Sequence, residues 1–136
     1  ITTQEPLLFE EGSFYISSEK KELLRKILNP LLRRKEVFDV EISGYTDDKP
    51  IHPYKKFLYR DNFELSVKRA ESVAQFLIKK MHISPERISI AGYGPLKPAF
   101  PNISEQYRRL NRRVQIYIYI PPPKAFYEKW STKGKT

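Results

Sequence analysis

The feature that most constrains this chain is an apolar stripe between residues 62 and 81. Apolar side chains recur there with the spacing of one helical face, at Leu65, Ala70, Val73, Ala74, Leu77 and Met81. Asn62 is a good capping residue at the start of the predicted helix, and Pro85 limits how far it can continue. Because isolated helices are only marginally stable in water, this helix must pack against another part of the chain.

Strands with one buried face can supply that surface. Apolar and polar side chains alternate from Phe38 to Ile42, where Gly44 is the expected end, and again from Val114 to Ile120, which precedes three prolines. Two further strands are predicted at residues 14–16 and 87–91. A helix is predicted from Ser17 or Ser18 until Pro30 ends or kinks it, and a short one at residues 104–110.

The order of these elements is β-α-β-α-β-(α)-β, which predicts an α/β (α+β) fold. We expect a layered sheet of about four strands with helices on one face. The length of 136 residues and the 40% hydrophobic content fit one compact core. We therefore predict one domain over residues 1–120 and a basic, flexible tail over residues 121–136.

The charge of the chain indicates an anionic partner. Its 25 Lys and Arg residues against 16 Asp and Glu residues give a net charge of +9, which suits nucleic acid, anionic lipid or a wall polymer. No stretch approaches the roughly 20 apolar residues of a membrane span, and the first residues lack the pattern of a signal peptide. We expect an export or anchoring segment upstream of this sequence.

A candidate binding pair is formed by Asp47 and Arg69. Arg69 lies beside the apolar face of the helix predicted from residue 62, on one stripe with Asn62 and Ser66. A guanidinium near the sheet needs a carboxylate or another planar acceptor to offset its desolvation. Asp47, just after the preceding strand, is the candidate neighbour. Spacing alone favours the alternative, a structural ion pair between the two that ties the loop to the helix.

Two other functional classes are disfavoured by the sequence. An enzyme is not expected, because His52 and His82 are the only histidines, cysteine is absent, and neither histidine has metal or triad spacing. No metal or other cofactor is predicted. Tyr117 and Tyr119 could stack on bases, but the glycine-aromatic pattern of RNA-recognition sheets is missing, so nucleic acid is not the expected partner.

Four motifs in order resemble the OmpA C-terminal domain family. They are Gly44-Tyr45-Thr46-Asp47, Asn62 to Ala70 (sequence NFELSVKRA), Gly92-Tyr93-Gly94 with Pro98, and Asn111-Arg112-Arg113-Val114. The resemblance covers about residues 8 to 120. Within the family, the long insert between Asp47 and Asn62 is similar to that of MotB, the wall anchor of the flagellar stator.

The resemblance implies that the chain binds peptidoglycan without cleaving it. Asp47 would face the ammonium group of the stem diamino acid and Arg69 its carboxylate, while Thr46, Asn62, Ser66 and Arg113 would lie near the same site. It also implies a periplasmic domain of an inner-membrane-anchored protein, which forms a homodimer and has a stator partner in the membrane. An outer-membrane or lipoprotein tether of the OmpA or Pal type is the alternative.

Overall fold

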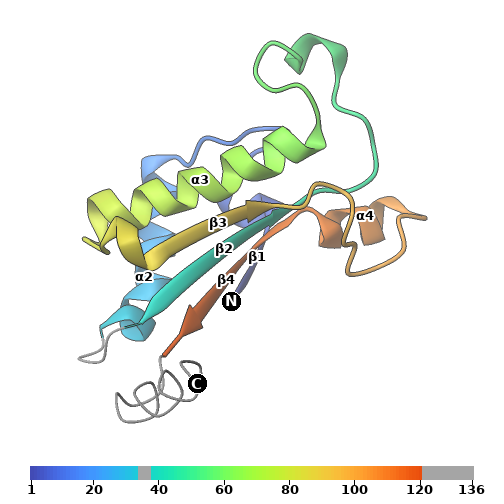
Figure 1. The fold of residues 1–136 in the computed structure, drawn as a ribbon. Helices are drawn as coiled ribbons and strands as arrows, with labels where there is room; N and C mark the ends of the chain where they lie inside the picture. Colours follow the sequence, from blue (N-terminus) through green and yellow to red (C-terminus); the bar gives the residue numbers. More distant parts are fainter. Residues whose placement is uncertain (34–37, 121–136) are drawn as a thin grey trace, which may run out of the picture.

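The computed structural model describes residues 1–33 and 38–120, and these residues form one mixed four-stranded sheet (Figure 1). The strand order is β1-β4-β2-β3, with β1 at Thr2–Gln4, β2 at Asp39–Tyr45, β3 at Ile88–Gly92 and β4 at Arg113–Tyr119. β4 runs antiparallel to both β1 and β2, whereas β2 and β3 are parallel. The predicted sheet of about four strands is confirmed.

Two long helices cover one face of this sheet (Figure 1). They are α2, Ser18–Leu32, and α3, Asn62–Lys80. Their apolar stripes meet the inward side chains of β2 and β4 in a core with almost no exposed surface, which includes Leu24, Leu28, Val73, Leu77, Ile42 and Ile116. Two shorter helices, α1 at Glu5–Leu8 and α4 at Glu105–Asn111, lie at the end of the sheet where the site forms.

The ends of the long helices differ in detail from the sequence predictions. Pro30 does not end α2, which continues for two residues to Leu32. α3 is capped by Asp61, whose carboxylate accepts a hydrogen bond from the backbone N–H of Glu64, and not by Asn62. α3 ends at Lys80, before Pro85, because His82 takes a left-handed backbone conformation with φ of 58°.

The prediction of a strand at residues 14–16 is wrong. This segment is irregular, and its neighbourhood is held by side chains of α3: Ser72 donates to the carbonyl of Phe14, and Arg69 donates to the carbonyl of Ser13. The first strand is instead Thr2–Gln4, with only Thr3 buried. A three-residue strand without apolar alternation gives no periodic signal in the sequence.

Gly44 and Gly92 let α3 cross the sheet closely. Gly44 does not end β2, which runs on to Tyr45, and it pairs with Gly92 on β3. A Cβ atom at Gly44 would lie 2.2 Å from the backbone oxygen of Ser66, and one at Gly92 would lie 2.7 Å from the Ser66 hydroxyl. This close approach places the start of α3 against the carboxyl end of β2.

Three remaining predictions concern the chain as a whole. Among the helices of residues 1–33 and 38–120, none has the length and apolar character needed to cross a bilayer. The predicted tail, residues 121–136, lies outside the described residues. The domain limits of 1–120 remain a prediction.

Candidate ligand-binding site

A cavity of about 460 Å³ opens at the carboxyl end of β2. Its walls come from α1, from residues 11–12, from the loop over residues 46–62, from the start of α3 and from α4. Charged side chains of both signs line it, including Glu5, Asp47, Lys49, Arg69, Glu105 and Arg112. The cavity therefore offers charged hydrogen-bond donors and charged acceptors within one pocket.

Four of these side chains form a chain of alternating charge. Asp47 Oδ2 accepts from Arg112 Nη1 at 2.7 Å, and Arg112 Nε donates to Glu5 Oε1 at 3.0 Å. Glu5 Oε2 then accepts from Arg69 Nη2 at 2.7 Å. Asp47 and Arg69 thus line the same cavity, but they are joined through Arg112 and Glu5. The structural ion pair of Arg69 is with Glu5, not with Asp47.

Arg69 is almost completely buried, with 2% of its surface exposed. Its Nε donates to the Ser13 carbonyl at 2.7 Å, and its guanidinium lies 4.9 Å from the centre of the Phe9 ring. Burial lowers the pKa of Arg69, and the charge and hydrogen bond of Glu5 oppose that effect. Among the described residues, Nη1 of Arg69 has no hydrogen-bond partner.

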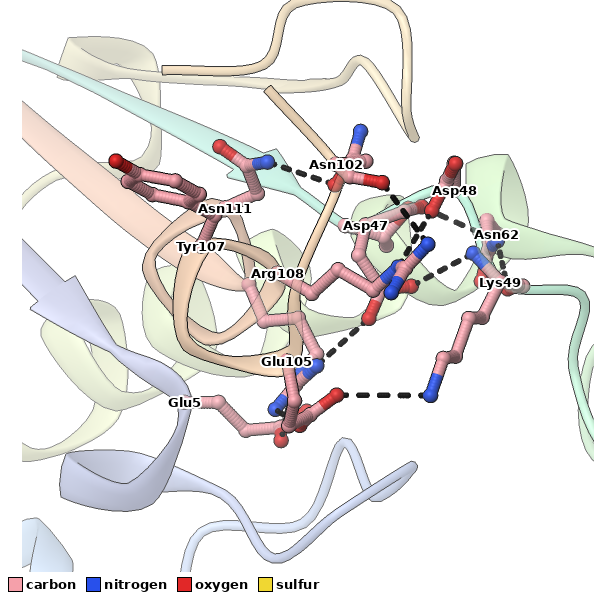
Figure 2. A network of polar contacts seen from close by, with 12 residues as sticks. Glu5, Asp47, Asp48, Lys49, Asn62, Asn102, Glu105, Tyr107, Arg108 and Asn111 are labelled. Atoms are coloured by element: carbon pink, nitrogen blue, oxygen red, sulfur yellow. Dashed lines mark hydrogen bonds and ion pairs between the residues drawn. The ribbon is translucent and has the colours of Figure 1, made fainter. Parts of the chain in front are cut away.

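Asp47 is fixed by the backbone of its own loop. Its Oδ1 accepts from the backbone N–H of Lys49 at 3.0 Å, and Thr46 Oγ1 donates to the Asp47 carbonyl at 2.9 Å. Asn62 Nδ2, at the start of α3, donates to the Lys49 carbonyl at 2.8 Å (Figure 2). The loop segment that carries Asp47 is therefore tied directly to the first residue of α3.

Helix α4 holds the same loop from the other side (Figure 2). Arg108 Nε donates to Asp48 at 3.0 Å, and Lys49 Nζ lies 3.6 Å from Glu105. Glu105 also accepts from Arg112 Nη2 at 2.8 Å, and the hydrogen bond and charge of Arg112 lower the pKa of Glu105. These contacts hold the loop that carries Asp47 against α4.

The structure brings four of the six predicted site residues to the cavity and places two elsewhere. Thr46, Asp47, Asn62 and Arg69 line the cavity. Ser66 is one of the two that do not: its hydroxyl donates to the Phe63 carbonyl and accepts from the N–H of Gly94, and so supports the close helix-sheet crossing.

Arg113 is the other residue that does not line the cavity. Its guanidinium lies 3.8 Å from the centre of the Tyr45 ring and donates to the Lys97 carbonyl. Burial lowers the pKa of Arg113. Arg113 is the first residue of β4, whereas Arg112 just before it directs its side chain to the cavity residues Glu5, Asp47 and Glu105.

The sequence analysis missed Arg112 and Glu5. Burial acts to lower the pKa of Arg112, but its hydrogen bonds to Asp47 and Glu105 and the charge of Glu5 outweigh this and raise it. The family resemblance placed Arg113 near the site. The motif contains two adjacent arginines, and it does not show which of them enters the cavity. Glu5 lies 64 residues before Arg69 in the chain, so no local pattern could connect them.

The arrangement suits non-covalent binding of a small group that carries both a positive and a negative or polar end. Within residues 1–33 and 38–120, no group of three or more acidic, histidine or cysteine residues is placed to hold a metal ion. The cavity does contain a carboxylate and a guanidinium on opposite ends of one ion-pair chain. Such a pair recognises complementary charges on a ligand.

The family of this chain follows from comparison with known proteins. The sequence profile of the OmpA family matches residues 8–112. The chain belongs to the OmpA family and is a non-enzymatic peptidoglycan-binding domain of that family.

Within this family the chain is similar to motility proteins. It is 34% identical to Motility protein B of Bacillus subtilis and 31% identical to the uncharacterized protein YtxE of the same organism, over 118 residues in each case. Both alignments cover 87% of this chain but only 44% and 47% of the two relatives. The chain thus spans about half the length of these relatives.

Solved structures share the fold. The cell wall anchor of the type VI secretion system from Pseudomonas aeruginosa is 29% identical, with a TM-score of 0.76, and the match covers 89% of this chain and 80% of that one. The periplasmic domain of Helicobacter pylori MotB has a TM-score of 0.78 at 24% identity, covering 98% of this chain and 81% of that one. The second likeness concerns the fold alone.

Proposed function

We propose that this domain binds the diamino acid of the peptidoglycan stem between Asp47 and Arg69. The observation that carries the proposal is the cavity, which a buried guanidinium and a carboxylate line together, each held in place by other side chains. Asp47 takes the ammonium group, and Arg69 Nη1 takes the carboxyl end. Thr46 and Asn62 position the loop that carries Asp47.

We further propose that this binding anchors a membrane protein to the cell wall. The parent protein is a flagellar stator subunit of the MotB type, with the domain in the periplasm and a membrane partner subunit reached through a segment outside this sequence. The similarity to Motility protein B and the long loop after Asp47 support this assignment. An outer-membrane or lipoprotein tether of the OmpA or Pal type is the second candidate, because membership of the OmpA family fits both kinds of parent protein.

Co-sedimentation with insoluble peptidoglycan tests the binding proposal. We expect the wild type to sediment with the wall, and we expect Asp47→Ala and Arg69→Ala to remain in solution. Arg25→Ala is the matched control, because Arg25 is exposed on α2 and, among the described residues, pairs with Glu22 of the same helix. Failure of the wild type to sediment, or retention of binding in both site variants, would refute the proposal.

Self-association is the remaining part of the proposal. We infer from the similarity to Motility protein B that this domain forms a homodimer at high concentration. Sedimentation equilibrium over a wide concentration range is the measurement. A purely monomeric species throughout would argue against the dimer and leave the binding proposal unaffected.

A further inference from the structure

The hydrogen bonds of Arg69 leave only part of its guanidinium for a ligand. Nε is used by the Ser13 carbonyl, and Nη2 is used by Glu5 and lies 3.4 Å from the Glu10 carbonyl. Among the described residues, Nη1 alone is without a partner. A free carboxylate is best held by two parallel N–H bonds from an arginine, and this arrangement is not open while Glu5 occupies Nη2.

Glu5 is held firmly in this position. Its backbone N–H donates to the Arg112 carbonyl at 2.8 Å, and its own carbonyl accepts from the N–H of Phe9 at 2.7 Å. Both carboxylate oxygens are bound, one by Arg69 and one by Arg112. The side chain is 6% exposed. Displacing Glu5 would separate its buried carboxylate from Arg69 and Arg112, which is costly. A ligand therefore binds while Glu5 keeps its position.

The positive charge of Arg69 is therefore already paired with the carboxylate of Glu5. A ligand group that accepts from Nη1 lies on the same guanidinium as the Glu5 carboxylate. A free carboxylate there would place a second anion beside Glu5, which is a costly juxtaposition in a desolvated site. A carboxamide would fit, because its oxygen accepts from Arg69 and its N–H group donates to Glu5.

We propose that Glu5 makes this site selective for a stem diamino acid whose carboxyl group is amidated, in preference to the free acid. The inference rests on the proposed function and specifies the chemical form of its ligand. Asp47 still takes the ammonium group. Glu5 acts as the specificity-determining residue, because its charge decides whether the group beside Arg69 may be an anion or must bring an N–H donor.

Isothermal titration of the wild type with two probes tests this directly. The probes are meso-diaminopimelic acid and its monoamide, each acylated as in a short stem peptide. We expect the monoamide to bind at least about tenfold more tightly, since each factor of ten corresponds to about 1.4 kcal/mol and a like-charge contact costs more than that.

The variant Glu5→Gln should remove the preference. A glutamine keeps one oxygen for an arginine and supplies an N–H group that can donate to a free carboxylate, so we expect the two probes to bind within about threefold of each other. Glu11→Gln is the matched control, because Glu11 also lines the cavity and is exposed. It removes the same charge and should keep the preference.

The outcomes separate this inference from the proposed function. If the wild type binds the free acid as tightly as the monoamide or more tightly, the selectivity is refuted and wall binding stands. Binding of neither probe refutes both. Should Glu5→Gln fail to fold, the wild-type comparison still decides the preferred ligand, and a preference that persists in a folded Glu5→Gln protein refutes the role of Glu5.

Discussion

The floor and the rim of the cavity differ in how deeply their side chains are buried. The charged floor, which consists of Glu5, Asp47, Arg69 and Arg112, is buried or nearly so, and every member bonds to another. The rim loop, residues 50–61, carries Tyr54 and Phe57 at 64% and 83% exposure. Packing therefore fixes the position of the charges, whereas the rim can vary without disturbing them.

In the described part of the chain, two side chains of the rim loop donate hydrogen bonds to the backbone of residues 11–12. Tyr59 is buried and donates its hydroxyl to the Gly12 carbonyl at 2.7 Å, and Lys55 Nζ donates to the Glu11 carbonyl at 3.0 Å. Substitutions in the floor should therefore affect both stability and binding. Substitutions at the exposed part of the rim should affect stability little.

The largest effect is expected for Arg69→Ala. This change leaves the buried carboxylate of Glu5 with Arg112 as its single partner and removes a packed side chain from the core side of α3. Loss of one member of a buried ion pair costs about 3 to 5 kcal/mol. Chemical denaturation should show this loss, and Arg25→Ala, which removes an exposed arginine of α2, should change stability by less than about 1 kcal/mol. Equal effects of the two variants would contradict the comparison between floor and surface.

A somewhat smaller loss is expected for Gly44→Ala. The added methyl group would meet the backbone oxygen of Ser66, an atom that cannot rotate away. Overpacking of this kind costs about 1 to 3 kcal/mol. Because α3 must shift to relieve the contact, we also expect weaker peptidoglycan binding in the sedimentation assay. A Gly44→Ala protein with unchanged stability and binding would show that α3 is not in close contact with β2 at Gly44.

Tyr59→Phe tests the point where the rim loop meets the floor. Losing the hydrogen bond to Gly12 should cost about 0.5 to 1.5 kcal/mol. Burial raises the pKa of Tyr59 above its ordinary value of 10.0. The neutral Tyr59 hydroxyl thus makes its full contribution to the free energy of unfolding below pH 10. This contribution is lost as the pH rises through the folded-state pKa. Thermal melts across this range should show a shallower alkaline decline in Tyr59→Phe than in the wild type, and identical slopes would exclude this role.

The smallest effect on stability is expected for Phe57→Ser. Phe57 is the most exposed large apolar side chain of the rim loop, so its removal should change the free energy of unfolding by less than about 0.5 kcal/mol. If the rim contacts the glycan, binding to whole peptidoglycan should weaken while binding to a soluble stem peptide stays the same. A measurable loss of stability would mean that the rim is packed more tightly than its exposure indicates.

Sequence periodicity predicted the parts of the fold that are amphipathic. The stripe of α3 and the alternation in β2 and β4 reflect one buried face, and all three elements were predicted within a few residues of their observed bounds. β1 and α1 are short and lack such a pattern, so they were not predicted. The irregular segment at residues 14–16 resembled a strand because it is a run of apolar residues, but only Ile16 is buried, Tyr15 is 70% exposed, and the Phe14 carbonyl bonds to Ser72 of α3.

The site was predictable only as far as a motif or a helical stripe defined it. Asp47 and Arg69 were found in this way, and both line the cavity. Their partners Arg112 and Glu5 belong to opposite ends of the chain, 107 residues apart. Pairing over such a distance depends on the register between β1 and β4, which the sequence pattern does not specify.

The pairing of β1 with β4 also has a consequence for how the domain acquires its activity during folding. Glu5 directly follows β1 and Arg112 directly precedes β4, and these two strands are neighbours in the sheet. Contacts between distant segments form late, because the intervening chain must be ordered first. The cavity can therefore be complete only after the last strand has docked, and a nascent or incompletely folded chain has no assembled site with which to hold the wall.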